Sequence, residues 1–340
     1  MKRLAILWVA LLALAVAARA QHEHGEHGHH GMAHKAATGV KLEVQDDAAV
    51  QSILLRVGPM KLPAHSDHMT VAQPPDLYWV IPIDGWLVGY HPRLVDAAGN
   101  AVPGRLLHHV AFWNTRRSDF LCPNKQEHIF GAGGEMNDWP AVPGYGYLLQ
   151  KGERVRIETM VHNPTDTNYL QTYLEVRMDY RARGTETAPI KSVYPAWIDV
   201  MQCGHSGYDL KPGSSSQTGE VTVKYSGTLL GVGGHMHNYG KRLVLENLTR
   251  TEEVAALDPK LDPSGHILSM PVKTFFDRGG YRINRGERFR VTATYDNPAG
   301  KMLPEGAMGI VVGYFVPDDN APMAALRRTL RGSRTEKKTN

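Results

Sequence analysis

The sequence predicts an all-β protein of two tandem β-sandwich or jelly-roll domains. From about residue 41 onward, short runs alternate between apolar and polar side chains, as in Leu174, Val176, Met178 and Tyr180 against Glu175, Arg177 and Asp179. Turn-forming pairs such as Pro103-Gly104 and Pro212-Gly213 lie between such runs. No convincing amphipathic helix precedes the C-terminal tail. Alternation with a period of two, broken by frequent turns, is typical of antiparallel sheets that pack as sandwiches.

An internal repeat predicts that there are two domains. Residues 152–164 read GERVRIETMVHNP and residues 286–298 read GERFRVTATYDNP, with the same spacing from Gly to Asn-Pro. Each copy predicts a turn, an alternating strand and a stop at Asn-Pro, so two sandwiches of like topology would each contain this strand once. Because Gly, Thr and Pro gather near residues 183–190, we place the domains at 41–186 and 187–318.

The first twenty residues have the pattern of a secretory signal peptide. Lys2 and Arg3 precede an apolar stretch over 4–18, and Ala18-Arg19-Ala20 forms a small-residue cleavage site. The stretch is shorter than the roughly 20 residues that span a bilayer, and no later segment is long enough, so we expect no transmembrane segment. We therefore predict an exported protein, either periplasmic or secreted.

A histidine-rich tract follows the cleavage site at residues 21–40. Its six histidines are His22, His24, His27, His29, His30 and His34, set among Gly and Glu. Such a composition cannot build a hydrophobic core, so we predict a disordered accessory tract that binds Cu(II), Ni(II) or Zn(II) loosely.

Charge gives no reason to expect a nucleic-acid partner. The formal net charge of +4 includes Lys2, Arg3 and Arg19, which are removed with the signal peptide. Basic residues also cluster from Arg327 to Lys338 in the segment 319–340, which we expect to be a short helix and a solvated basic tail.

The two cysteines, Cys122 and Cys203, have two interpretations. Export permits a disulfide between them, which we favour. Alternatively Cys203, with His205 two residues further on, contributes to a metal site.

The strongest metal-binding motif is His235-Met236-His237, which follows Gly231-Val232-Gly233-Gly234. On a strand the two-residue period places both imidazoles on one face. We expect the preceding glycines to leave room for a metal ion and a substrate.

Three further segments contain candidate ligands. His108 and His109 are adjacent, so on a regular strand they point to opposite faces, and both reach one ion only where the chain bulges or bends. Alternation places Met160 and His162 on one face. Met308 opens the apolar run 310–316 beside Gly and Ala, which lets a thioether approach a metal. Imidazole with thioether suits Cu(I) and imidazole alone holds Cu(II), whereas the usual zinc sites add thiolates or a carboxylate.

At these motifs the chain resembles the ascorbate-dependent type II copper monooxygenases, which include peptidylglycine α-hydroxylating monooxygenase and dopamine β-monooxygenase. The resemblance covers roughly residues 76–317. Its motifs, in order, are the pair His108-His109 before apolar residues, His162 before Asn-Pro, His235-x-His237 before Gly and Lys, and Met308 before Tyr314, Phe315 and Pro317.

The resemblance implies two jelly-roll domains that face each other across a solvent-filled cleft, each with one copper ion. His108, His109 and a third histidine would bind the electron-transfer copper, and His235, His237 and Met308 the catalytic copper. A gapless comparison puts Met160 at the third ligand position of the first site. Either a small register shift brings in His162, or Met160 itself binds, or the first copper binds weakly.

We therefore predict an exported copper-dependent monooxygenase that hydroxylates a C–H bond of a small molecule or peptide with O2 and an external reductant such as ascorbate. A non-catalytic exported copper-binding or storage protein is the main alternative. A two-sandwich carbohydrate-active or adhesion protein that has lost the metal is the third.

Overall fold

Strands form nearly all of the regular structure in the computed structural model, which describes residues 36–135 and 141–326. In these residues the other elements are the short helix α1 (Ala321–Ala324) and the 3-10 turns η1 (Gly104–Leu106) and η2 (Phe276–Arg278). The all-β prediction is confirmed. The predicted signal peptide, the histidines from 22 to 34 and the basic residues beyond 326 lie outside the described residues.

The strands form three large sheets and two small ones. The largest has the order β1 (Lys41–Asp47), β2 (Ser52–Leu62), β9 (Tyr169–Ala182), β4 (Gly85–Val95), β7 (Tyr145–Leu149), β10 (Lys191–Asp199), β22 (Gly309–Pro317), β13 (Gly227–Met236), β18 (Val272–Thr274), with β19 (Tyr281–Ile283) also on β13. The second is β3 (Leu77–Val80), β8 (Arg154–Val161), β5 (Leu107–Ser118), β6 (Gln126–Gly133). The third is β12 (Gly213–Thr222), β20 (Arg288–Asn297), β14 (Gly240–Asn247), β15 (Glu252–Leu257). The small pairs are β11 (Tyr208–Leu210) with β21 (Leu303–Ala307), and β16 (Lys260–Leu261) with β17 (Ile267–Ser269).

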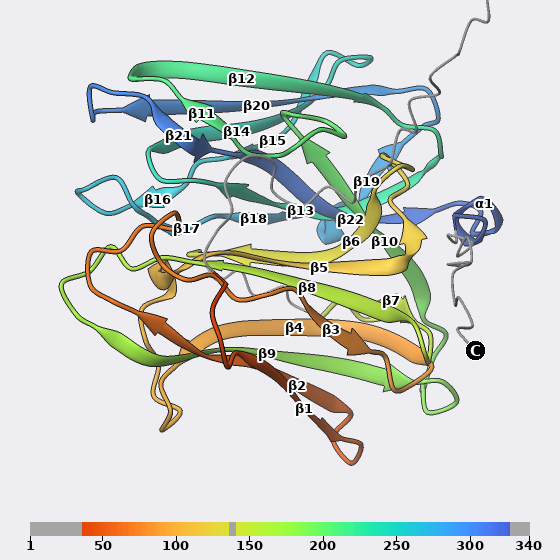
Figure 1. Ribbon diagram of the computed structural model, residues 1–340. Coiled ribbons are helices and arrows are strands. Elements are labelled where there is room, and N and C mark those ends of the chain that lie inside the picture. The colour runs from red at the N-terminus through yellow and green to blue at the C-terminus, as the bar shows by residue number, and fades with distance from the viewer. Residues whose placement is uncertain (1–35, 136–140, 327–340) are drawn as a thin grey trace, which may run out of the picture. The chain divides into compact units, whose positions relative to one another are not determined.

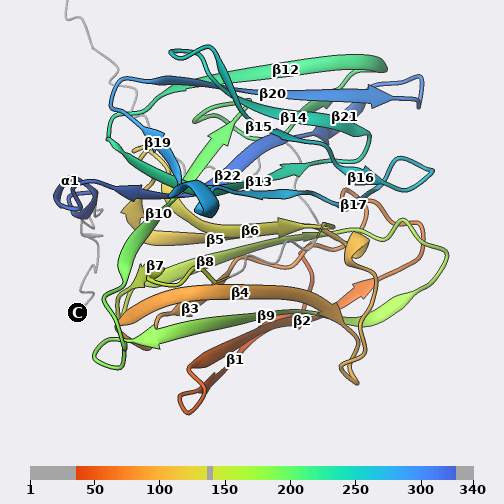
Figure 2. The same cartoon turned by 180° about the vertical axis from the view of Figure 1, so that it is seen from behind.

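These sheets stack in layers (Figures 1 and 2). From top to bottom in Figure 1 lie the β12-β20-β14-β15 sheet, the β22-β13 part of the largest sheet, the β8-β5-β6 sheet, and the β4-β9-β2 part of the largest sheet. The largest sheet therefore contributes two of the layers. It continues from one to the other where β7 pairs with β10 in parallel, with Tyr145 opposite Lys191 and Tyr147 opposite Val193.

Two hydrophobic clusters fill the spaces between layers. One consists of residues from 40 to 193 together with Leu230, and the other of Phe120, Leu121, Cys122 and residues from 194 to 323. The first cluster thus includes one side chain from the later part of the sequence, and the second includes three from the earlier part. We call residues 41–186 the N-terminal half and residues 187–318 the C-terminal half.

A disulfide joins the halves. Cys122, between β5 and β6, is bonded to Cys203, which follows β10. The alternative role of Cys203 as a metal ligand is wrong, since its sulfur is in the disulfide, and His205 is instead 2.8 Å from a Glu305 carboxylate oxygen.

Both copies of the internal repeat form strands, and each supports the same buried network. In the N-terminal half the amide of Asn114 donates to the Tyr147 hydroxyl at 3.2 Å and to Glu153 at 2.9 Å. Arg117 donates to the same Glu153, and the Tyr147 hydroxyl donates to Glu127.

The C-terminal half repeats this arrangement residue by residue. Asn247 donates to the Tyr281 hydroxyl and to Glu287, both at 3.1 Å. Arg250 donates to Glu287 at 2.8 Å, and Tyr281 donates to Glu252 at 2.9 Å. Glu153 and Glu287 are the second residues of the two repeated segments, so the repeat seen in the sequence carries one polar network into both halves.

Candidate metal centre

A β-bulge brings the adjacent histidines of β5 towards each other. Across the β5–β8 pair, Leu107 lies opposite Val161, but His109 lies opposite Met160, so His108 is an extra residue on β5. A bulge of this kind redirects one side chain. The ring centroids of His108 and His109 are 5.2 Å apart. The bulge that both side chains need in order to reach one ion is therefore present.

The end of β13 provides the second group of ligands. His235 lies on β13 opposite Ile310 of β22, and His237 follows the last residue of the strand. The expectation that the preceding glycines leave room for a metal is wrong for Gly234. A Cβ atom there would lie 2.7 Å from Met270 and 2.8 Å from Leu243, so this glycine makes room for core side chains.

The space beside His235 comes from Gly133 of β6. A Cβ atom on Gly133 would lie 2.7 Å from Cε1 of His235. Gly133 also pairs across strands with His109. The β5–β6 edge of the N-terminal half and the end of β13 are therefore in direct contact.

Histidines from both halves converge at this contact. Ligand nitrogens of His108, His109 and His237 all lie within 4.8 Å of one another, and the ring centroids of His108 and His237 are 4.4 Å apart. We call these three residues the histidine cluster. The family resemblance implied two different copper ions for them, whereas in the structure the three histidines lie together.

The other predicted ligands border the cluster. The His162 ring is 5.2 Å from that of His108, and its Nε2 lies 2.7 Å from the Arg105 carbonyl oxygen. The His235 ring is 5.6 Å from that of His237, and its Nδ1 lies 2.9 Å from Oε1 of Glu135. Met160, the alternative to His162, is buried opposite His109.

Met308 is tied to His237 through a tyrosine. The Tyr295 hydroxyl accepts hydrogen bonds from the backbone N–H groups of His237 and Met308, both at 3.0 Å, and donates to the Met308 carbonyl oxygen. The antiparallel register of β13 and β22 agrees, since Met236, just before His237, pairs with Gly309, just after Met308. His237 and Met308 are therefore neighbours across the two strands.

Burial favours the neutral form of two histidines of the cluster, His108 and His237. Burial, followed by the neighbouring imidazoles, lowers the pKa of His108 and of His237 well below the usual histidine range. Burial likewise lowers the pKa of His162 to about 4. For His235 burial lowers the pKa, but the Glu135 carboxylate outweighs it and the net shift is upward. A neutral imidazole offers a lone pair to a metal ion, so His108 and His237 are in the protonation state that a metal ligand requires.

Sequence reasoning missed three residues at this contact. His68 stacks on His108 with a centroid distance of 4.7 Å and an interplanar angle of 4°. His128 is 1% exposed and its ring centroid lies 3.6 Å from that of Trp197 and 4.5 Å from that of Trp113. Glu135 completes the set. None has a histidine or carboxylate partner at strand spacing, so no local pattern marked them; the small residues Gly131-Ala132-Gly133-Gly134 were the available signal.

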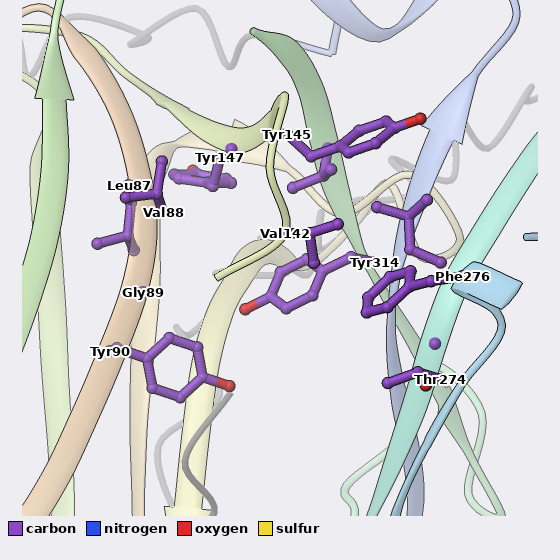
Figure 3. A pocket seen from close by; sticks show the side chains of 14 residues that line it. Leu87, Val88, Gly89, Tyr90, Val142, Tyr145, Tyr147, Thr274, Phe276 and Tyr314 are labelled. Carbon is purple, nitrogen blue, oxygen red and sulfur yellow. The ribbon is translucent and has the colours of Figure 1, made fainter. Parts of the chain in front are cut away.

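A separate apolar pocket lies at the junction of the two halves (Figure 3). It has about 590 Å³ of space including open solvent, and tyrosines, valines and Phe276 line it. The Tyr314 hydroxyl hydrogen-bonds Tyr90, whose ring lies close to it in Figure 3. Gly231 of β13 borders this pocket and His235 is four residues further on, roughly 13 Å at strand spacing. None of the residues that line the pocket belongs to the histidine cluster, so the pocket and the cluster are separate features.

Comparisons with known proteins leave the family undetermined. No family model matches the chain, and no curated protein matches it. One solved structure with some likeness is described as the structure of infectious bursal disease virus Gx strain, at 11% identity and a TM-score of 0.19, over 85% of this chain and 72% of that chain. A likeness this weak carries no argument about fold or function. Among the described residues, no helix is long and apolar enough to cross a lipid bilayer.

Proposed function

We propose that the protein is an exported copper-dependent monooxygenase whose copper is held by His108, His109 and His237. The observation that carries the metal site is the convergence of three ligand nitrogens within 4.8 Å, from two halves of the chain. Neither ring nitrogen of the buried His237 has a hydrogen-bond partner at normal geometry among the described residues. Burial lowers the pKa of His237, and the backbone of Glu305 offsets only part of that shift. A bound cation would compensate for the missing hydrogen bonds of these buried nitrogens.

The donor set fits copper. Three neutral imidazoles suit copper or zinc, and no thiolate is available because both cysteines are in the disulfide. Met308 lies next to His237, and its thioether is a donor that favours the soft ion Cu(I). When bound, copper supplies the one-electron redox chemistry that the use of dioxygen requires.

The residues of the chain hold and shield the site. His108 and His109 on the bulge and His237 after β13 fix the ligand geometry, while Tyr295 holds the backbone beside His237 and Met308. In the proposed reaction a substrate C–H bond becomes C–OH, O2 is reduced to that hydroxyl oxygen and water, and an external reductant such as ascorbate supplies two electrons with two protons. The substrate would be a small molecule or a peptide.

Copper stoichiometry and O2 uptake test this function. We use a chain in which His22, His24, His27, His29, His30 and His34 are replaced by Gln, called the tract-silenced chain, so that the N-terminal tract does not contribute. Tight copper binding with ascorbate-dependent O2 consumption and a hydroxylated product, from a panel of amines, peptides and small aromatics, is expected. Absence of tight copper binding would overturn the proposal.

Copper storage or delivery is the second candidate. It is favoured by the burial of His237 and by the lining of the apolar pocket, which contains no residue of the histidine cluster. Under this function the tract-silenced chain binds copper tightly, but consumes no O2 with ascorbate and any substrate in the panel.

A further inference from the structure

The carboxylate of Glu135 contacts His235, and its own position is fixed. Its Oε1 lies 2.9 Å from Nδ1 of His235 and accepts a 2.9 Å hydrogen bond from the backbone N–H of Gly133. The Glu135 side chain is 2% exposed and that of His235 is 12% exposed. A buried carboxylate with two partners has little freedom to move, so it defines where the imidazole lies.

This contact determines which nitrogen of His235 can bind a metal. An ionised carboxylate only accepts hydrogen bonds, so Nδ1 of His235 carries the proton that faces it. The lone pair of the neutral ring is then on Nε2. That atom is buried and has no hydrogen-bond partner among the described residues. In protein metal sites, a histidine that binds the ion through one ring nitrogen usually donates a hydrogen bond from the other nitrogen to a carboxylate or carbonyl group.

The ring also stands at the edge of the histidine cluster. It lies over Gly133, whose cross-strand partner is His109, and its plane is at 84° to that of His237, with 5.6 Å between centroids. Glu135 follows β6 in the N-terminal half, and His235 lies on β13 in the C-terminal half. The pair therefore links the halves beside the metal centre.

We propose that Glu135 is a positioning residue that holds His235 as the Nδ1–H tautomer with Nε2 towards the histidine cluster, and so makes His235 a fourth imidazole ligand. This inference rests on the proposed copper site. It adds the ligating atom of His235, the residue that selects that atom, and a link through which the N-terminal half controls a ligand of the C-terminal half.

The test uses Glu135→Ala and Glu135→Gln in the tract-silenced chain. Asp179→Asn is the matched control, because Asp179 lies 3.1 Å from His91 in another histidine–carboxylate pair, on β9 and β4. Copper affinity is measured by competition, and the number of bound imidazoles by pulsed electron paramagnetic resonance. The tautomer of His235 in the metal-free chain is read from ¹⁵N chemical shifts, assigned with His235→Asn.

We expect Glu135→Ala to lower copper affinity about 10- to 100-fold, to remove one imidazole from the spectrum, and to move the metal-free ring towards the Nε2–H tautomer. Glu135→Gln retains an acceptor oxygen and should fall between wild type and Glu135→Ala. Asp179→Asn should change none of these readouts.

Three results separate the possible failures. Glu135→Ala with wild-type affinity, imidazole count and tautomer overturns the role of Glu135 while the copper site stands. A tract-silenced chain with wild-type Glu135 that binds no copper overturns the proposed function, and the fourth-ligand role with it. A loss of metal-free stability in Glu135→Ala without a change in the spectra would show that the pair is purely structural.

Discussion

The hydroxyl group of Tyr295 accepts a 3.0 Å hydrogen bond from the backbone N–H of His237. It accepts another of equal length from Met308, so a single buried side chain, 1% exposed, sets the relative positions of two predicted copper ligands. Tyr295 lies on β20, within the second copy of the internal repeat. Strand β20 therefore holds the backbone of the candidate metal centre in place through Tyr295.

Tyr295→Phe should weaken both the fold and the site. Each buried N–H that loses its acceptor costs about 1–3 kcal/mol, and the loops that present His237 and Met308 lose their common anchor. We expect a lower free energy of unfolding in urea and a lower copper affinity. Tyr208→Phe is the control, because the Tyr208 hydroxyl has no hydrogen-bond partner among the described residues and its ring packs edge-on against Tyr295. Equal effects of the two substitutions would contradict the anchoring role.

Met308→Ile should abolish hydroxylation while the fold survives. The substitution removes the thioether but nearly keeps the side-chain volume, so the cost in unfolding free energy should stay below about 1.5 kcal/mol. X-ray absorption on the Cu(I) form should show a sulfur scatterer in wild type and none in the variant. A fully active Met308→Ile chain would exclude Met308 from the copper site.

The contribution of His162 to the stability of the metal-free chain should be lost as the pH drops below about 6.5, the pKa of histidine in an unfolded chain. Burial lowers the pKa of His162 to about 4, so the unfolded state binds more protons than the folded state between these two values. Its contribution is complete above pH 6.5 and is lost towards pH 4; the lowered pKa values of His108 and His237 act in the same direction. His235, with a raised pKa, acts oppositely and stabilises the fold at low pH.

Urea unfolding at a series of pH values checks this dependence. His162→Asn should flatten the decline between pH 6.5 and pH 4. The same dependence of stability on pH in wild type and in His162→Asn would show that His162 is not held neutral in the folded chain.

Reduction of the Cys122–Cys203 disulfide should destabilise the protein substantially. The bond closes a segment with a sequence separation of 81 and joins the loop after β5 to the segment after β10. Chain-entropy arguments give about 4–5 kcal/mol for a loop of this length. The double variant Cys122→Ser, Cys203→Ser should show that loss in urea unfolding and weaker copper binding, since the halves are less firmly joined. Unchanged copper affinity in the folded double variant would show that the disulfide does not maintain the cluster.

Local patterns predicted the strands well. The alternation over 174–180 became β9, with Leu174, Val176, Met178 and Tyr180 all buried, and both copies of the repeated segment became strands. From the sequence we also expected His108 and His109 to reach one ion only if the strand bulges there, and the structure has this bulge. These results follow because side-chain direction on a strand depends on near neighbours in the chain.

The position of the cluster could not be predicted in this way. His109 and His237 are far apart in the sequence, and their approach depends on how the β5–β6 edge packs on the end of β13. Glu135 lies beside His235 because of the same packing between the two halves. Gly133 is required because the His235 ring packs against it, not because of its backbone conformation. The resemblance to a two-copper family pointed to the histidines that form the cluster but assigned them to two separate ions.

The most direct test of the shared metal site is copper binding by the tract-silenced chain with His109→Ala or His237→Ala, one from each half. His205→Ala, which alters an exposed histidine paired with Glu305, is the control. If one ion binds both halves, each cluster substitution alone lowers the affinity of the same tightly bound copper at least about 10-fold, and pulsed resonance shows one imidazole fewer. Two coppers in wild type, with His109→Ala removing one and His237→Ala removing the other, would contradict the shared site.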